Sequence, residues 1–311
     1  MKFYIHPTNQ RWFDFLRQEP REDVNFWKPS APNFTLLPPD SPFLFLLNKP
    51  NKFIAGAGIY AGKMKVTLDE AWSIFGTRNG VNSREEFRQL IYDGRYPPDS
   101  ANAPFLCLTL NAPVFFDRAD WLPVPDGWSN NLVQGKSYDT GELAGQRLWQ
   151  QVQPVLDYYR AKAPLLLPAA PALVLEPAAR YRLALVRPEQ PAFRTMVTQA
   201  YAGRCAISGE KTLPVLEAAH IIPYAEAGPS VVSNGLLLRS DLHKLFDQHY
   251  LTVTVDANKL RVKVSPCIRS EFSNGKEYYQ YDGKNLQVIP KAVLERPMRE
   301  YLERHNSLLR S

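Results

Sequence analysis

The sequence is sparing with cysteine and histidine. Its 311 residues include three cysteines, Cys107, Cys205 and Cys267, and five histidines. Three widely spaced cysteines argue against a disulfide framework and are typical of a reducing compartment. No stretch approaches the ~18 consecutive apolar residues of a membrane-spanning helix, and the N-terminus lacks the basic, apolar and small-residue segments of a secretory signal. We therefore expect a cytoplasmic protein that makes no membrane contact.

The composition is that of a folded chain with a mild positive charge. Hydrophobic residues make up 45% and charged residues 22%, so disorder is not expected. The 37 Lys and Arg exceed the 31 Asp and Glu by six, which permits a polyanionic partner without identifying one. A chain of 311 residues has room for two domains of ordinary size.

Local patterns predict an α+β protein in three regions. Residues 1–153 mix strand patterns with helix signals at 67–76 and 83–94, and residues 42–62 predict two strands whose Gly56 and Gly58 mark a bulge or a close backbone approach. This predicts a curved sheet or small barrel with short helices. Residues 154–190 carry a proline every few positions, which predicts a semi-rigid linker. Residues 191–311 predict short strands, a hairpin at 251–265 and helices at 191–203 and 296–310.

Two of the five histidines lie on either side of one loop in the last region. His220 ends a predicted strand, and His243 lies in the short helix that follows the loop. A strand, loop and helix in this order can bring the two imidazoles together. Neutral imidazole accepts a proton from water near pH 7 and is a common metal ligand. The pattern therefore predicts a general base beside a metal ion, whereas His249 and His305 are expected to be solvated or capping residues.

The string "CAISG…EAAHIIPY…NGLLLRSDLHKLFD", residues 205–247, resembles the HNH endonucleases of bacterial restriction and defence, which have the ββα-metal fold. In that family a first histidine activates water, a middle asparagine fixes the loop, and a residue nine positions further on binds a divalent metal. The matching residues here are His220, Asn234 and His243. The resemblance extends over residues 190–311 and implies a metal-dependent DNA endonuclease that uses Mg²⁺ or Mn²⁺.

The sequence departs from the family pattern at the residue before the first histidine. Many members have an acidic metal ligand there, but this chain has Ala219. Asp247, one helical turn after His243, and Asp241 are the expected replacements, and Glu217 is a further candidate. Many relatives also hold a structural zinc with two CxxC pairs. Only Cys205 remains of those four positions, so no structural zinc is expected.

Three stretches near the N-terminus, "NFWKPS" (25–30), "FLFLLNKPNKFIAGAGIYAG" (43–62) and "EAWSIFGTRNGV" (70–81), resemble PUA-like domains of the EVE and SRA types. Such domains are small curved barrels that hold an RNA base or an extruded, modified DNA base in an aromatic pocket. The resemblance implies a pocket with aromatic faces and with polar groups for phosphates or base edges. The candidates are Trp27, Tyr60, Trp72, Lys28 and Asn79.

Together the two resemblances imply a modification-dependent, type IV-like restriction endonuclease acting in phage defence. Its PUA-like domain, residues 1–153, would recognise a modified cytosine in double-stranded DNA. A Pro-rich linker, residues 154–190, would join it to the HNH domain, residues 191–311, and a homodimer would cut both strands. Two alternatives remain open. One is an HNH nuclease gated by a phosphorothioate or a ligand, and the other is a DNA-binding module with a degenerate HNH fold, which Ala219 favours.

Overall fold

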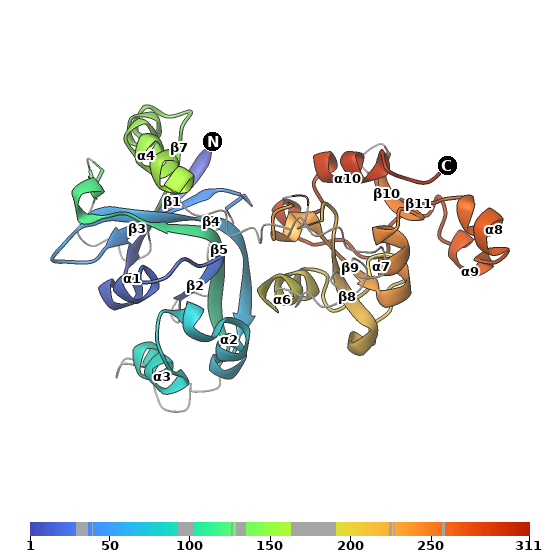
Figure 1. Cartoon of the computed structure of the whole chain (residues 1–311), viewed down its shortest axis with the longest axis horizontal. Coiled ribbons are helices and arrows are strands. Elements are labelled where there is room, and N and C mark those ends of the chain that lie inside the picture. The colour runs from blue at the N-terminus through green and yellow to red at the C-terminus, as the bar shows by residue number, and fades with distance from the viewer. Residues whose placement is uncertain are drawn as a thin grey trace, which may run out of the picture. The chain divides into compact units, whose positions relative to one another are not determined.

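The chain forms two compact units, Met1–Pro191 and Ala192–Ser311, in a computed structural model (Figure 1). The structure describes residues 1–28, 37–38, 40–92, 103–125, 127–128, 135–162, 191–223, 226, 228–256 and 259–311. Each unit combines helices and strands around its own hydrophobic core. The predicted α+β class is therefore confirmed.

The N-terminal unit is built around one sheet. Its strands are β1 (Lys2–Thr8), β2 (Asp23–Lys28), β3 (Pro42–Leu47), β4 (Phe53–Val66), β5 (Phe105–Phe115), β6 (Leu122–Pro123) and β7 (Lys136–Asp139). Its helices are α1 (Gln10–Leu16), α2 (Leu68–Phe75), α3 (Arg84–Tyr92) and α4 (Leu143–Lys162), with short 3-10 turns η1 (Gly76–Asn79) and η3 (Arg118–Asp120).

The strands of this sheet follow the order β2-β5-β4-β3-β1-β7, and β6 pairs with β4. β1 and β3 are parallel, and the other pairs are antiparallel. The register of β4 shifts twice against β5 and once against β3, as β-bulges do. These irregularities bend the long β4 strand. Closure of the sheet into a barrel stays a prediction.

Two local predictions in this unit are confirmed. A Cβ atom on Gly56 would lie 2.5 Å from the carbonyl oxygen of Val114, so the neighbouring backbone approaches too closely for a side chain. Helix α2 begins after Thr67, whose hydroxyl accepts from the Glu70 N–H while the Glu70 carboxylate accepts from the Thr67 N–H. This capping box satisfies two backbone donors that the helix itself leaves unpaired.

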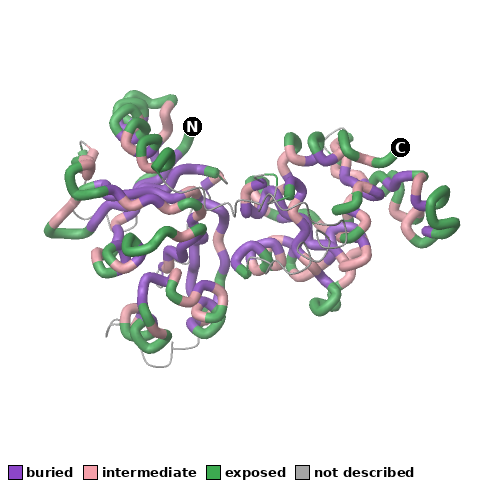
Figure 2. The backbone as a smooth tube through the Cα atoms, in the orientation of Figure 1, coloured by how far each residue is buried: buried purple, intermediate pink, exposed green. Residues whose placement is uncertain are grey.

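Alternate residues of β1 belong to two different cores. Tyr4 packs with Trp12 and Phe13 of α1, whereas Phe3 and Ile5 pack with the apolar residues of α4. Successive side chains of a strand point to opposite faces, so α1 and α4 cover opposite faces of the sheet. Figure 1 shows the two helices on either side of it, and Figure 2 shows the strands buried between them.

Helix α4 corrects the predicted domain boundary. The first domain was expected to end at residue 153, but α4 continues through Pro154 to Lys162. Leu148, Val152 and Leu156 recur one helical turn apart and are buried against the sheet. This apolar face holds the helix together across the proline, so residues 154–162 belong to the N-terminal unit. The remainder of the expected linker, residues 163–190, lies outside the described residues.

The C-terminal unit contains two antiparallel strand pairs and several helices. Its strands are β8 (Leu216–His220), β9 (Gly235–Arg239), β10 (Leu251–Asp256) and β11 (Lys259–Val264). Its helices are α6 (Pro191–Ala200), α7 (Ser240–Asp247), α8 (Cys267–Phe272), α9 (Lys276–Tyr279) and α10 (Arg299–Asn306), with 3-10 turns η4 (Leu213–Val215), η6 (Val232–Asn234) and η7 (Val293–Glu295). Of the helices described in either unit, none has the length and apolar character needed to cross a membrane.

His305 corrects a second expectation. It was expected at the surface, but it is 3% exposed and its ring stacks on Phe246 with centroids 3.8 Å apart. Its Nε2 lies 3.2 Å from the Phe246 carbonyl oxygen, and its Nδ1 lies 2.7 Å from the Thr252 hydroxyl. The reason is that α10 packs on β10 and turns this face of the helix inward.

Candidate functional site

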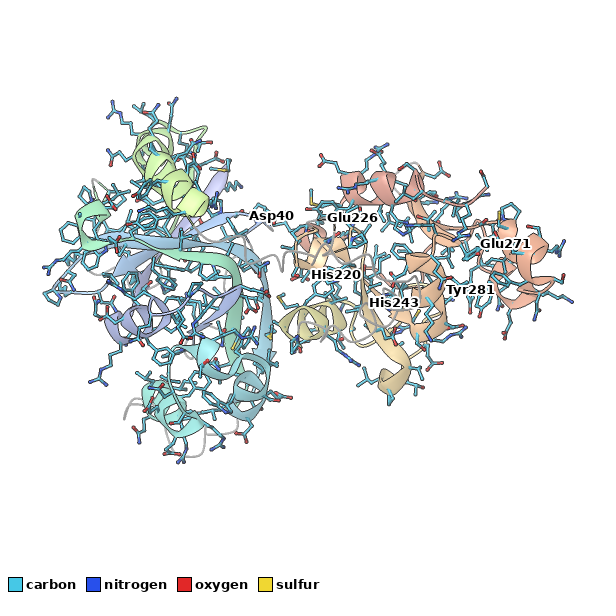
Figure 3. The ribbon with its side chains drawn as sticks, viewed as in Figure 1. Asp40, His220, Glu226, His243, Glu271 and Tyr281 are labelled. Atoms are coloured by element: carbon cyan, nitrogen blue, oxygen red, sulfur yellow. The ribbon has the colours of Figure 1, made fainter. Side chains whose placement is uncertain are left out.

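The two histidines of interest lie on one ββα unit made of β8, β9 and α7. β8 pairs with β9 so that His220 is opposite Gly235, and α7 follows β9 directly. A Cβ atom on Gly235 would lie 2.6 Å from Val197 and 3.1 Å from Phe193, so α6 can approach only because this residue is glycine. Leu242 and Phe246 anchor α7 in the core. Figure 3 shows His220 and His243 in the same part of this unit.

Asn234 ties the two ends of the loop together. Its Oδ1 accepts from the Ile222 N–H at 2.9 Å, and its Nδ2 donates to the carbonyl oxygens of Ile222 at 3.0 Å and Pro229 at 2.9 Å. The Ile221 N–H also donates to the Asn234 carbonyl oxygen. The asparagine is fully buried. Because these bonds begin one residue after His220, they fix the backbone that carries it.

His220 is held as a neutral imidazole. Its ring stacks on Phe193 of α6, with centroids 3.7 Å apart and planes at 12°, and its Nε2 lies 3.4 Å from the Ser230 hydroxyl. Burial lowers the pKa of His220 to about 4; the charge of His243 also lowers it, and Asp247 opposes the change. A histidine with this pKa is unprotonated at neutral pH and can accept a proton. Sequence reasoning did not identify Phe193 or Ser230 as its partners.

His243 lies between two carboxylates. Its Nδ1 is 2.7 Å from Oε2 of Glu217 on β8, and its Nε2 is 3.3 Å from Oδ2 of Asp247, one turn further along α7. Burial opposes protonation of His243, but the two carboxylates outweigh it and raise its pKa to about 9. The hydrogen bond between Glu217 and His243 also holds the pKa of Glu217 below its usual value. The two histidines therefore have opposite protonation states near pH 7.

The donor atoms of His243 and Asp247 fit a divalent ion. Two ligand atoms that each lie about 2.1 Å from one ion are about 3 Å apart at the usual coordination angles, close to the observed Nε2–Oδ2 separation of 3.3 Å. Among the described residues, no group of three or more His, Cys, Asp or Glu side chains is arranged to hold a metal. His243 and Asp247 could thus supply two ligands, and water or phosphate the others.

Asp241, the other expected ligand, has a different partner. Its two carboxylate oxygens accept from Nε and Nη2 of Arg239 at 2.6 and 2.8 Å. The guanidinium holds the pKa of Asp241 below its usual value. The structure therefore joins Asp247 and Glu217 to His243, and joins Asp241 to Arg239.

Cys205 lies where the related proteins begin a zinc-binding pair. Its Sγ accepts from the backbone N–H groups of Ser208 at 3.4 Å and Arg239 at 3.3 Å, and the residue is buried. Backbone hydrogen bonds thus occupy this sulfur, and the neighbouring Arg239 side chain is engaged with Asp241.

The five residues expected to form a base pocket divide between two faces of the N-terminal sheet. Trp27 and Trp72 both contact Phe87 of α3, and the Trp27 Nε1 donates to the Asn79 carbonyl oxygen. Asn79 is fully buried, and its amide bonds to Asn25 and to backbone oxygens of α2 and η1. Lys28 and Tyr60 lie on the other face, because Lys28 follows Trp27 directly in β2 and Tyr60 packs in the core with Phe26.

That second face holds a histidine that sequence reasoning missed. His6 of β1 is 6% exposed, and its ring lies 4.7 Å from Phe26 and 6.0 Å from Phe43. Its Nδ1 lies 2.6 Å from the Pro7 carbonyl oxygen, and its Nε2 has no hydrogen-bond partner among the described residues. Burial and, to a smaller extent, the charge of Lys28 lower the pKa of His6 to about 3. The available signal was a histidine that directly follows the apolar and aromatic residues Phe3, Tyr4 and Ile5.

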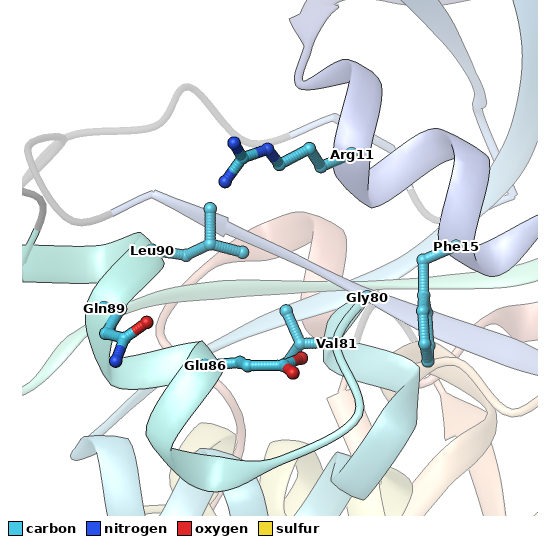
Figure 4. A pocket seen from close by; sticks show the side chains of 7 residues that line it. All are labelled: Arg11, Phe15, Gly80, Val81, Glu86, Gln89 and Leu90. Atoms are coloured by element: carbon cyan, nitrogen blue, oxygen red, sulfur yellow. The ribbon is translucent and has the colours of Figure 1, made fainter.

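The N-terminal unit also contains a cavity of about 360 Å³ (Figure 4). Arg11 and Phe15 of α1 line it together with Glu86, Gln89 and Leu90 of α3, and with Gly80 and Val81. Its volume is at the lower end of the range for small-molecule sites. None of the five expected pocket residues lines it.

Residues 205–254 match the family model of the HNH endonucleases. The match contains the strand pair, the loop and the helix that carry His220, Asn234 and His243. The resemblance of this region to HNH endonucleases is therefore confirmed.

Three solved structures are similar to the chain at low identity. Two are of ASCH from Zymomonas mobilis. The first has 11% identity and a TM-score of 0.32, and the match covers 47% of this chain and 93% of that chain. The second, a mutant, has 10% identity and a TM-score of 0.32, and the match covers 48% of this chain and 98% of that chain. The third is the modification-dependent TagI restriction endonuclease, with 12% identity, a TM-score of 0.29 and coverage of 98% of this chain and 82% of its own. No curated protein matches the chain.

Proposed function

We propose that the protein is a modification-dependent restriction endonuclease that hydrolyses phosphodiester bonds in double-stranded DNA. The observation that carries this proposal is the pair of histidines on the ββα unit, which have opposite protonation states near pH 7. His220 is neutral and able to accept a proton, and His243 stands beside Asp247 with donor atoms spaced for one ion. Both lie in the segment that matches HNH endonucleases.

In this reaction His220 takes the proton from the water that attacks the phosphorus atom. Phe193 holds the plane of the imidazole, and Asn234 holds the backbone on which His220 lies. Mg²⁺ or Mn²⁺, when bound by His243 and Asp247, supplies positive charge for a phosphate oxygen and the leaving oxygen. The arrangement keeps the base unprotonated next to the groups that bind the cation.

The acidic groups near His243 favour a nuclease over a degenerate binding module. Ala219 removes the acidic residue that many relatives have before the first histidine. Asp247 nevertheless lies 3.3 Å from the Nε2 of His243 and Glu217 lies 2.7 Å from its Nδ1, so the group is not short of carboxylates.

We further propose that the N-terminal unit recognises a modified cytosine that is turned out of the duplex. The sheet face that carries His6 and Lys28 combines aromatic rings with polar groups, as base-binding sites do. Tyr4, Phe26 and Phe43 surround His6, and Lys28 is buried on the same face. The unpartnered Nε2 of His6 can accept a hydrogen bond from the exocyclic amino group of cytosine. Two copies of the chain would cut the two strands.

The test is cleavage of matched DNAs, one unmodified and one cytosine-modified, by wild type and His220→Ala with Mg²⁺ or Mn²⁺. We expect wild type to cut only the modified DNA and His220→Ala to cut neither. Equal cutting of both DNAs would support the nuclease activity and contradict the recognition of modified cytosine by the N-terminal unit. No cutting with either metal, together with metal-independent DNA binding, would establish a binding module.

A second pair of variants tests the reader separately. Lys28→Met is expected to reduce the preference for modified DNA while leaving cutting by the C-terminal unit possible. Lys162→Met is the matched control, because Lys162 is an exposed lysine at the end of α4. An unchanged preference in Lys28→Met would exclude the sheet face that carries His6 and Lys28 as the reading site.

A further inference from the structure

We infer that Glu217 is a positioning residue that fixes the tautomer of His243, so that Nε2 of His243 is the nitrogen presented to the metal ion. This inference rests on the proposed nuclease function, because it concerns the same site. It assigns Glu217 a contact with the ligand histidine and no contact with the ion.

The position of Glu217 on β8 makes this contact possible. Glu217 and Ala219 are two residues apart on one strand, so their side chains leave the same face of the hairpin. Ala219 is buried in the core that also contains Leu242 of α7, and the Glu217 carboxylate reaches His243 on that helix. An acidic side chain is therefore supplied from this face, two residues earlier along the strand than in the family pattern.

The hydrogen bond defines which ring nitrogen carries the proton. An ionised carboxylate can only accept, so Nδ1 of His243 must donate to Oε2 of Glu217, 2.7 Å away. Because Nδ1 keeps its proton in this hydrogen bond, Nε2 is the nitrogen that can release its proton and offer a lone pair to a metal ion. Nε2 is also the nitrogen that faces Asp247, at 3.3 Å. The two carboxylates thus have separate tasks.

The geometry argues against Glu217 as a direct ligand. The two nitrogens of one imidazole point in different directions, so an ion bound at Nε2 is remote from an oxygen that is hydrogen-bonded to Nδ1. Ligand histidines commonly donate their second N–H to a carboxylate in this way, which fixes the ring and raises its basicity. Glu217 contacts Nδ1 of His243 and Asp247 contacts Nε2, which is this arrangement.

The tautomer can be read directly in the full-length chain. Nitrogen-15 labelling of the five histidines, with His243→Gln for assignment, separates Nδ1 from Nε2 of His243 by chemical shift. Zn²⁺ is the probe, since it is diamagnetic and binds imidazole. We expect Zn²⁺ to shift Nε2 while Nδ1 keeps its proton. Zinc bound at Nδ1 in wild type, or an unchanged proton position in zinc-bound Glu217→Ala, would overturn the inference.

Metal affinity gives the second readout. Titration calorimetry with Mn²⁺, without DNA, is expected to show a loss of about 10- to 100-fold in Glu217→Ala, the usual effect of removing such a partner. Glu217→Gln should recover part of this loss, because its amide oxygen can still accept from Nδ1. Glu303→Ala, an exposed glutamate of α10 in a surface ion pair, is the matched control. Equal affinities in wild type and Glu217→Ala would also overturn the inference.

These measurements separate the inference from the proposed function. If wild type binds Mn²⁺ through Nε2 of His243 but cuts no DNA, the proposed function fails and the role of Glu217 stands. If wild type cuts modified DNA and Glu217→Ala retains both the affinity and the tautomer, the role of Glu217 fails and the nuclease stands. Circular dichroism of each variant checks that the unit remains folded.

Discussion

The imidazole of His220 and the ring of Phe193 lie face to face, 3.7 Å apart at centroids and 12° from parallel. Phe193 is in the first turn of α6, outside residues 205–254 that match the HNH family. The proposed base is thus oriented by a helix that precedes the nuclease motif. The stacked phenylalanine covers one face of the imidazole and leaves its nitrogens at the edge.

Replacing Phe193 should lower the cleavage rate strongly while the C-terminal unit remains folded. In Phe193→Leu the site stays apolar but loses the flat surface that sets the plane of His220. We expect kcat to fall about 10- to 100-fold, because small displacements of a catalytic group have effects of this size. The measurement is single-turnover cleavage of modified DNA, with urea unfolding of the same variant.

The control for this substitution is Phe272→Leu. Phe272 is 57% exposed at the end of α8, so the same chemical change there should leave the rate unchanged. Tyrosine at position 193 is unsuitable, because the ring tip already approaches Gly235 closely. A Phe193→Leu enzyme with the wild-type rate would show that the stack does not position the base.

Asn234→Asp should destabilise the C-terminal unit even though the two side chains have nearly the same shape. The asparagine amide donates to the carbonyl oxygens of Ile222 and Pro229, and a carboxylate has no proton to donate. At about 1 kcal/mol for each bond, with a further cost for oxygens that face each other, we expect a loss of about 3 kcal/mol.

Urea unfolding of Asn234→Asp, Asn234→Ala and wild type checks this expectation. The aspartate variant should be at least as unstable as the alanine variant, because it adds repulsion to the lost bonds. Asn285→Asp, at an exposed position, is the matched control and should unfold with wild type. A fully stable Asn234→Asp would mean that the amide does not hold the loop.

Metal affinity should rise with pH. The two carboxylates outweigh burial and raise the pKa of His243 to about 9, so the metal-free histidine is protonated at neutral pH. A metal ion must displace that proton from the imidazole, and the apparent affinity therefore increases about tenfold per pH unit until pH ~9. Mn²⁺ titrations in buffers of different ionisation enthalpy should show about one proton released per ion near pH 7. An affinity that does not change with pH would contradict the assignment of His243 as a ligand.

His305 should make the C-terminal unit less stable in acid. Burial lowers its pKa to about 4, and His249 adds to the effect, whereas an unfolded histidine has a pKa of about 6.5. Above pH ~6.5 His305 is neutral in both the folded and the unfolded state, so it does not lower the free energy of unfolding. As the pH falls from there towards 4, the unfolded state binds a proton that the folded state excludes. The free energy of unfolding then falls by up to about 1.4 kcal/mol per pH unit.

The His305→Gln variant isolates this contribution. Glutamine can keep a hydrogen bond with Thr252 but does not titrate, so its unfolding free energy should depend less on pH between about 6.5 and 4. Above pH 7 the pH dependence of the two proteins should be parallel. Identical slopes in acid would show that His305 is not the group responsible.

The nuclease motif is predictable from the sequence because its geometry is local. His220, Asn234 and His243 lie within one hairpin and the following helix, and the strand, loop and helix patterns together with the HNH resemblance predicted one ββα unit. The same holds for the α2 capping box and for Gly56, where the residue types themselves carry the conformational requirement.

The partners of those residues depended on the tertiary structure. Glu217 and Asp247 were two of three acidic candidates. The spacing of one helical turn placed Asp247 beside His243, whereas the packing of α7 on β8 brings Glu217 to the other ring nitrogen. Phe193 reaches His220 through a helix packed across a glycine, a contact between segments that are distant along the chain.

In the N-terminal unit the sequence determined which residue types were available, and the sheet decided where they point. Trp27 and Lys28 are neighbours in sequence, yet they lie on opposite faces because side chains alternate along a strand. Helix α4 passes through Pro154 because its buried face outweighs the local preference of proline. Composition and local pattern thus fixed the classes of element and the nuclease motif, whereas long-range packing alone decided the faces, the partners and the protonation states.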